Sequence, residues 1–333
     1  MKDPGGRELR LGITVPLDGL PVAQTVVPLA RLAQECGFTD VWSAEVGGTD
    51  GLTPLAMVAG ACPEMRLGTA ILPVFTRPPA LLAMGAASLQ ALSGGRFLLG
   101  IGTSSSIIVN QWMGVPFEKP YTRMRETVEV LREMLAGKKA SNGFRLMTDP
   151  TAPVPIYVAA LGPKMLRLAG EVADGVILYL FTPQGAREAI AQVHESARAA
   201  GRDPSTIDVV ARIGVAVDED EQTLKYMLRR LTTSYAMVDV YNASLSRQGF
   251  ASEAAELSRL WNAGDRDGAA SAVSDAMLDG LYITGSAEQC RQKLQLFRQA
   301  GITTPVLFPI SVVGDPAERL ERSRGVVRSL SGA

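Results

Sequence analysis

The chain has 333 residues, of which 47% are hydrophobic, with 33 basic and 34 acidic residues. This length and apolar content allow one large buried core, so we expect a single domain spanning residues 1–333. The net charge of −1 lacks the basic excess typical of nucleic-acid-binding proteins and argues against a nucleic-acid partner.

In chain order, strand-like and helix-like segments alternate. The predicted elements are strand 9–17, helix 24–37, strand 38–44, helix 53–62, strand 65–74, helix 78–95, strand 96–102, helix 121–138, strand 154–160, helix 162–173, strand 174–180, helix 183–201, strand 206–217, a long helical region at 220–279, helix 286–301 and strand 303–310. The helix at 78–95 has proline near its start and glycines at its end, as helix boundaries often do.

Repeated β-α units with apolar strands predict a parallel sheet covered on both faces. Eight such units in a chain of this length favour a closed (β/α)8 TIM barrel over an open doubly wound sheet, which stays the alternative. The first strand is followed by no G-x-G-x-x-G motif, and this weakens the dinucleotide-binding version of the open sheet.

Two connections exceed what a barrel needs, namely residues 103–120 after the fourth strand and 218–280 after the seventh. Because barrel active sites lie at the carboxyl ends of the strands, we expect these insertions to cover a ligand; plain surface loops are the alternative. Their large side chains supply walls for a substrate pocket. The residues that we expect to line it are Trp112, Met113, Tyr235 and Tyr241.

A single histidine restricts the chemistry of the chain. His194 lies in an amphipathic helical pattern, where a surface or boundary position is the simplest interpretation. A Ser-His-Asp triad and a multi-histidine metal site are therefore excluded, and we expect no metal. The natural source of chemistry is a bound organic cofactor.

The cysteines and the first residues indicate a cellular location. Cys36, Cys62 and Cys290 are scattered and form no C-x-x-C motif, as in reduced cytosolic proteins. No stretch resembles a signal peptide or a membrane span. We therefore expect a soluble cytoplasmic protein without a membrane partner.

The carboxyl ends of two predicted strands carry residues suited to ligand binding. Gly100 and Gly102 permit close approach, and the segment from Thr103 through Ser104 and Ser105 to Ser106 offers hydroxyls. After the fifth strand, Ala159 and Ala160 leave room, and the helix that starts Gly162, Pro163, Lys164, Met165 offers free N–H groups to an anion. An ordinary strand-to-helix connection is the alternative there.

Glu45 follows the second predicted strand and precedes two glycines. A carboxylate at this end of a barrel is a candidate proton donor or polar anchor. A solvated loop acid is the alternative, and desolvation would raise the pKa of a buried carboxyl.

Four long stretches together resemble the bacterial luciferase-like superfamily of (β/α)8 flavin and deazaflavin oxidoreductases, and are most similar to its coenzyme F420-dependent branch. These stretches are "VPLARLAQECGFTDVWSAE", "RLGTAILPVFTRPPALLAMGAASLQALSGGRFLLGIGTSS", "QWMGVPFEKPYTRMRETVEVLREMLAG" and "PIYVAALGPKMLRLAGEVADGVIL". The resemblance implies hydride transfer between coenzyme F420 and a small organic substrate, and a homodimer. An FMN-dependent monooxygenase using O2 and a non-catalytic cofactor-binding homologue are the alternatives.

The resemblance also assigns residues to the cofactor. It implies a non-proline cis peptide at Ala70–Ile71, forming a bulge against the ring system. It places cofactor phosphate at Gly162–Met165 and a further cofactor contact at residues 102–106. Relatives often carry Trp-His-Gly where this chain has Met113 after Trp112, so histidine catalysis is not available and Glu45 is the candidate acid.

Overall fold

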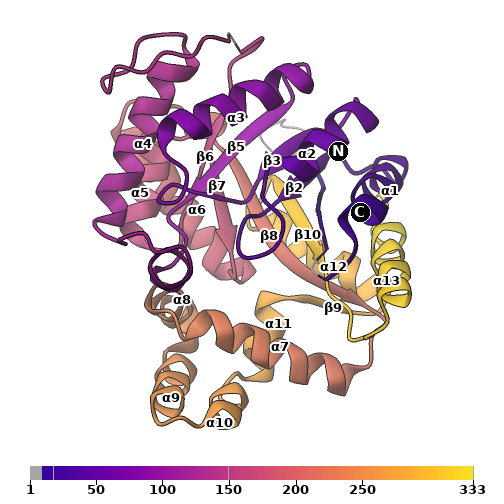
Figure 1. Cartoon of the computed structure of the whole chain (residues 1–333). Coiled ribbons are helices and arrows are strands. Elements are labelled where there is room, and N and C mark those ends of the chain that lie inside the picture. The colour runs from indigo at the N-terminus through magenta and orange to yellow at the C-terminus, as the bar shows by residue number, and fades with distance from the viewer. Residues whose placement is uncertain (1–9, 18, 149, 333) are drawn as a thin grey trace.

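Eight parallel strand positions close into a barrel that is ringed by helices (Figure 1). The computed structural model describes residues 10–17, 19–148 and 150–332. The strands of this part are β1 (Gly12–Thr14), β2 (Asp40–Ser43), β3 (Arg66–Thr69), β4 (Leu72–Pro73), β5 (Phe97–Gly102), β6 (Ile156–Ala159), β7 (Gly175–Tyr179), β8 (Asp208–Val217), β9 (Ile283–Gly285) and β10 (Thr304–Pro309). The helices that ring the barrel are α1 (Val22–Glu35), α2 (Thr53–Ala61), α3 (Pro79–Leu92), α4 (Pro120–Leu135), α5 (Pro163–Val172), α6 (Pro183–Ala199), α12 (Ala287–Gln299) and α13 (Pro316–Ser329).

The barrel closes through β10, which pairs with β1 on one side and with β8 on the other. β3 and β4 occupy one position in the ring, because both pair with β5 and only Ala70 and Ile71 separate them. All these pairings are parallel, so every strand ends at the same rim. The predicted (β/α)8 barrel is therefore confirmed.

The element boundaries differ from the sequence prediction in places. The first strand is shorter than residues 9–17, and Leu9 lies outside the described residues. The predicted loop after the fourth strand contains a short π-helix, Ile107–Trp112. The predicted helical region at 220–279 is divided into several helices, and the short strand β9 follows it without having been predicted.

One tryptophan fills the middle of the barrel. Trp42 is fully buried and packs with one apolar side chain from each of five other strands, namely Leu98, Tyr157, Ile177, Val210 and Val306. The neighbouring strands make room for the indole with glycines. A Cβ on Gly12 would lie 2.9 Å from Trp42 Cδ1, and a Cβ on Gly68 would overlap the six-membered ring. This layer closes the barrel beneath the rim where the strands end.

An ion cluster closes the opposite, amino-terminal end of the barrel. Arg66 Nη2 lies 2.6 Å from Asp40 Oδ2, and Arg66 Nη1 lies 3.5 Å from Asp208 Oδ2. The Tyr157 hydroxyl donates to Asp208 at 2.9 Å. Burial alone would raise the pKa of Asp208, but the charge of Arg66 and hydrogen bonds from neighbouring hydroxyls hold it below its usual value. This end of the barrel is therefore a structural plug.

The segment between β8 and β9 forms a helical lobe at the carboxyl end of the barrel, drawn in orange in Figure 1. Its helices are α7 (Glu221–Ala236), α8 (Asp239–Leu245), α9 (Ala251–Asn262), α10 (Arg266–Ser271) and α11 (Asp275–Leu281), with a π-helical turn at Ser246–Phe250. The lobe has its own apolar cluster, which includes Leu228, Leu257 and Met277. The predicted insertion after the seventh barrel strand thus lies on the rim.

The residues expected to carry no special chemistry occupy ordinary positions. His194 is half-buried on α6, which agrees with the predicted boundary position. Cys36, Cys62 and Cys290 are free thiols. None of the described helices is long and apolar enough to cross a membrane.

Candidate active site

The inward-facing side chains nearest the carboxyl rim differ from those of the layer beneath. The layer below is almost fully buried, with Trp42 and Val210 both 0% exposed. At the rim the inward-facing side chains are partly exposed, although they point toward the barrel axis. They are Ala70, Ile71, Ala159, Tyr179, Arg212 and Phe308. Solvent therefore reaches the rim layer from the carboxyl end, where barrel enzymes bind their substrates.

An apolar floor occupies one side of this rim. The Ala70–Ile71 peptide bond is cis, at the position that the resemblance predicts. The side chain of Ile71 lies over Gly102, since a Cβ on that glycine would be 2.7 Å from Ile71 Cγ1 and 3.4 Å from Ala159 Cβ. Small and aliphatic groups from three neighbouring strand positions thus present a surface suited to a flat apolar ring.

The structure corrects the prediction for Ala160. Its side chain is 1% exposed and belongs to the core between strands and helices. Ala159 packs against the barrel interior instead. The reason is the two-residue period of a strand, because successive side chains point to opposite faces.

The hydroxyl segment after β5 divides into two groups. Ser105 is used locally, since its Oγ accepts from the Ile108 N–H at 3.4 Å at the start of the π-helix. Ser104 has a left-handed backbone with φ of 59°. Within the described chain, the hydroxyls of Ser104 and Ser106 make no hydrogen bond, while Thr103 Oγ1 donates to the Ser104 carbonyl at 3.4 Å. Ser104 and Ser106 therefore remain available to a ligand.

The predicted anion site begins α5. Gly162 precedes Pro163 as the N-cap, and no side chain caps the helix. Pro163 has no N–H and the Met165 N–H donates to the Gly162 carbonyl at 3.0 Å, so the Lys164 N–H is the open donor of the first turn. Lys164 is exposed and Met165 is half-buried. Sequence reasoning missed Arg247, whose Nη2 would lie 3.8 Å from a Cβ on Gly162. The lobe thus brings a second positive charge to the start of α5.

Two side chains of the lobe tie it to the barrel rim. Arg247 Nη2 donates to the Leu161 carbonyl after β6 at 3.0 Å. Gln248 Nε2 donates to the Leu180 carbonyl after β7 at 3.1 Å, and Gln248 Oε1 accepts from the Thr182 N–H at 2.7 Å. These bonds position the lobe beside the predicted anion site.

Glu45 is anchored by Arg77 and by a backbone N–H. Arg77 donates through Nε to Glu45 Oε1 at 2.8 Å and through Nη2 to Oε2 at 2.5 Å, and the Gly51 N–H donates to Oε2 at 3.0 Å. Both side chains are 16% exposed. The hydrogen bonds to Glu45 raise the pKa of Arg77. Glu45 is thus held by a two-point ion pair in which both of its oxygens accept hydrogen bonds, and its role as an acid stays a prediction.

The two tyrosines predicted from the lobe meet a third one at the rim. The Tyr235 and Tyr241 rings lie 5.2 Å apart, and Tyr179 at the end of β7 lies 5.1 Å from Tyr235 and 6.4 Å from Tyr241. Burial raises the pKa of Tyr179 and of Tyr241, which keeps both phenols neutral. Together they form an aromatic wall above β7.

Trp112 and Met113 stand apart from this wall. Trp112 is 60% exposed and Met113 is 47% exposed. A Cβ on Gly47 would lie 3.4 Å from Trp112 Cζ3, so the indole covers the loop after β2. The predicted pocket residues therefore come to the rim from two sides, with Trp112 near the Glu45 loop and the tyrosines near β7.

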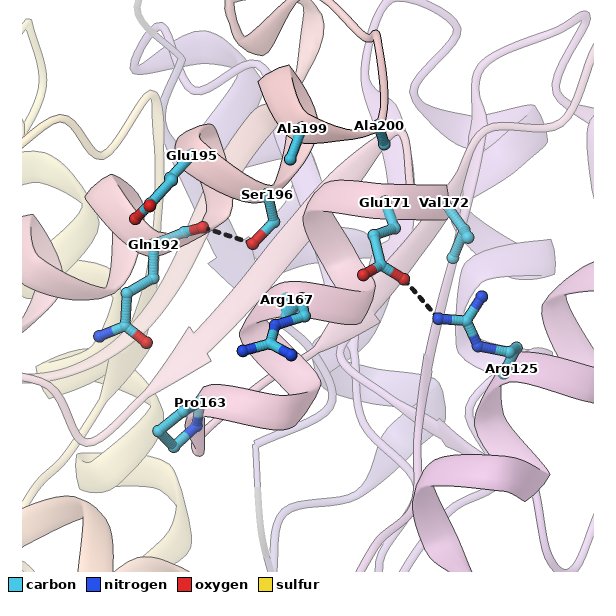
Figure 2. A pocket seen from close by; sticks show the side chains of 10 residues that line it. All are labelled: Arg125, Pro163, Arg167, Glu171, Val172, Gln192, Glu195, Ser196, Ala199 and Ala200. Atoms are coloured by element: carbon cyan, nitrogen blue, oxygen red, sulfur yellow. Dashed lines mark hydrogen bonds and ion pairs between the residues drawn. The ribbon is translucent and has the colours of Figure 1, made fainter.

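A hollow of about 600 Å³ lies outside the barrel, among α4, α5 and α6 (Figure 2). Arg125 on α4 pairs with Glu171 on α5 across it. Arg167 and Glu195 add one charge of each sign, so the lining is neutral. The hollow touches the predicted anion site only through Pro163 and is separate from the rim.

Comparison with known proteins agrees with this geometry. The family described as luciferase-like monooxygenase matches residues 10–304. The chain is 31% identical over 284 residues to 5,10-methylenetetrahydromethanopterin reductase of Methanolobus tindarius, with 82% of this chain and 86% of that protein covered.

Solved structures give the same result. The coenzyme F420-dependent tetrahydromethanopterin reductase of Methanopyrus kandleri superposes with a TM-score of 0.76 and 26% identity, over 95% of this chain and 97% of that one. An F420-dependent secondary alcohol dehydrogenase, solved with an F420-acetone adduct, shares the fold with a TM-score of 0.76 and 19% identity, over 97% and 99% of the two chains. The chain therefore belongs to the luciferase-like monooxygenase family.

Proposed function

We propose that the protein is a coenzyme F420-dependent oxidoreductase that transfers a hydride between this deazaflavin and a small organic substrate. The observation that carries the proposal is the apolar floor of Ile71, Gly102 and Ala159 together with the uncapped start of α5, where the Lys164 N–H is open. A flat ring and an anionic tail match these two features. The similarity to an F420-dependent reductase over 95% of the chain supports the same cofactor.

The residues present fit the cofactor. Gly102 carries no side chain where one would push Ile71 away, so the floor stays flat. The first turn of α5, with Lys164 and Arg247, would hold the phosphate, and Ser104 and Ser106 would donate to polar atoms of the tail. When bound, the deazaflavin supplies the hydride chemistry.

In this reaction the protein would orient the substrate against the cofactor and exclude water from both. The Arg77–Glu45 pair fixes the loop after β2, which carries Gly47 under Trp112. Tyr235 and Tyr241 would form the opposite wall and exclude water from the substrate. Within the described residues no three metal-ligating side chains come together.

Two other functions remain as competitors. The family description names a monooxygenase, which supports FMN as the alternative cofactor with O2 as the oxidant. The replacement of the frequent histidine by Met113 keeps a non-catalytic cofactor-binding homologue as the third candidate.

A titration separates these candidates. The purified protein is titrated with coenzyme F420 and with FMN, following quenching of cofactor fluorescence. We expect binding of F420, and Gly162→Asp should weaken it at least tenfold, because it places a negative charge at the phosphate site. Gly325→Asp on α13 is the control, since it adds the same side chain at a glycine that has no atom within 4 Å of an added Cβ. Binding of FMN alone would refute the F420 assignment, and tight binding without turnover of any alkene, imine, alcohol or carbonyl tested would support the non-catalytic homologue.

We propose also that the protein is a homodimer. The outer faces of α2 and α3 support this, because neither helix contains a charged residue. On α3, Leu81 and Met84 are each 44% exposed and Leu92 is 64% exposed. Neighbouring apolar helix faces of this kind mark association surfaces. Sedimentation equilibrium tests the proposal, and a monomer mass at micromolar concentration would contradict it.

We place the protein in the cytoplasm, with a small molecule as its partner and no nucleic acid or membrane. The three free thiols support a reducing compartment. A balanced charge of −1 supports the absence of a polyanionic partner.

A further inference from the structure

An arginine points into the barrel from the middle of β8. The inward positions of this strand alternate with outward ones, and the inward set is Asp208, Val210, Arg212 and Gly214. Asp208 belongs to the plug and Val210 to the buried middle layer. Arg212 stands above them in the partly exposed rim layer.

Two aromatic rings hold the guanidinium of Arg212. Its Cζ lies 4.4 Å from the centroid of Phe308 on β10 and 5.5 Å from the centroid of Tyr179 on β7. Aromatic faces attract a cation, and they leave its N–H groups free to donate at the edges. The one hydrogen bond of the side chain within the described chain runs from Nε to Thr14 Oγ1, at 3.5 Å.

The terminal nitrogens of Arg212 have no protein acceptor within the described residues, and no carboxylate lies within 4.0 Å of them. Three other partly buried arginines of the chain are satisfied. Arg66 and Arg77 pair with carboxylates, and Arg202 donates to two backbone carbonyls. A half-buried cation without a counter-charge costs free energy, so its retention at the rim indicates a ligand.

The topology places Arg212 opposite the apolar floor. Around the closed ring the order is β1, β2, β3/β4, β5, β6, β7, β8, β10, so β8 lies four positions from β3/β4 in either direction. Ala70–Ile71 and Arg212 therefore face each other across the rim. If the cofactor ring lies on the apolar floor, a molecule bound to the open face of that ring would contact Arg212. Tyr235 and Tyr241 pack around Tyr179 beside this position.

We propose that Arg212 binds the carboxylate of the substrate, which is an organic monoacid with an apolar, ring-sized body. This proposal rests on the proposed function, because it assigns the substrate side of the same site. The planar guanidinium fork matches a carboxylate through two N–H groups. A single cation balances one negative charge, and the tyrosine rings match an apolar body. Arg212 thereby orients the substrate toward the floor.

Benzoate serves as the probe, and its neutral counterpart benzamide serves as the comparison. Both are titrated calorimetrically into the protein, with and without saturating coenzyme F420. We expect benzoate to bind and benzamide to bind at least tenfold more weakly. Arg212→Met should weaken benzoate binding by about 10- to 100-fold, and Arg212→Lys should lose less, because it keeps the charge without the fork.

The matched control is Arg266→Met on α10. Arg266 also stacks on an aromatic ring, with Cζ 3.6 Å from the centroid of Trp261, but it lies on the exposed side of the lobe. It should leave benzoate affinity unchanged. Circular dichroism confirms the fold of each variant, and Arg212→Lys carries the test if Arg212→Met does not fold.

Three outcomes overturn the proposal. The first is a wild-type protein that does not bind benzoate, and the second is equal benzoate affinity in the wild type and the Arg212 variants. The third is an Arg212 variant that loses F420 affinity while keeping benzoate affinity, which would assign the arginine to the cofactor. Benzoate binding that depends on Arg212 in a protein that does not bind F420 would refute the proposed cofactor and leave the acid site standing.

Discussion

Replacing Gly68 by alanine tests whether Trp42 fills the barrel beneath the active site. An added Cβ would lie 2.6 Å from Trp42 Cδ2 and closer still to Cε3 and Cζ3. Carbon atoms in contact prefer 3.5–4.0 Å, so the overlap exceeds about 1 Å. Trp42 is fully buried between strands.

The expected cost is large for a single methyl group. Overpacking of a well-packed core costs about 1–3 kcal/mol, and this site belongs at the upper end because the strain falls on a rigid ring. The unfolding entropy of about 2.1 cal/mol/K per residue gives about 0.7 kcal/mol/K for 333 residues. A cost of about 3 kcal/mol therefore lowers the midpoint by about 4 °C, measured by circular dichroism at one scan rate.

Two further variants make this test specific. Gly325→Ala on α13 adds the same methyl group in open space and should raise the midpoint by about 1 °C, because alanine favours the helix by about 0.5–1 kcal/mol. The double variant Gly68→Ala with Trp42→Phe should be less destabilised than the sum of the single variants by about 1 kcal/mol or more. Additive costs, or a Gly68→Ala midpoint equal to that of the wild type, would refute the packing argument.

Two ion pairs give the remaining predictions. Glu45→Gln weakens the pair with Arg77, so we expect it to lower stability by about 1–2 kcal/mol. An unchanged shape of the pH–rate profile would show that Glu45 acts only as an anchor, whereas loss of one limb of that profile would identify it as the acid. Asp208→Asn leaves Arg66 with Asp40 alone and should cost about 3 kcal/mol at pH 7. Because the pKa of Asp208 is lowered in the folded protein, its stabilisation is present above about pH 4 and is lost as the pH falls through the lowered pKa. Urea midpoints of wild type and variant should therefore converge from pH 5 to pH 3, and a constant gap would contradict this.

The barrel was predictable because its signals are local and repeated. Each apolar strand is followed by a helix pattern, and prolines begin several helices, such as Pro79 in α3 and Pro183 in α6. The elements that the sequence did not predict are short or irregular. The strand β9 has three residues, and the turn at Ile107–Trp112 follows a hydroxyl-rich segment typical of a loop. Elements of this size depend on tertiary contacts that propensity does not report.

The site was less predictable, because its pairings join residues that are far apart in the chain. Glu45 resembles a free loop acid until Arg77, 32 positions later, is folded against it. Arg247 reaches the start of α5 from 86 positions beyond Leu161. The cis peptide at Ala70–Ile71 was expected from family resemblance and not from any local pattern. The two contacts form only in the folded chain, where neighbouring loops of the rim and the lobe meet.

Arg212 is the site residue that strand periodicity could have found. It interrupts the apolar segment "VVARIGV" of β8. A charged side chain at an inward position of a barrel strand is buried only when a partner compensates its charge. The charge of Asp208, four residues earlier on the same face, is compensated within the chain, because Arg66 and three hydroxyls contact it. At Arg212 the protein provides two rings and one long hydrogen bond. On one strand, then, the charge at the amino-terminal end is compensated for stability, and the charge in the middle of the strand is left for a ligand.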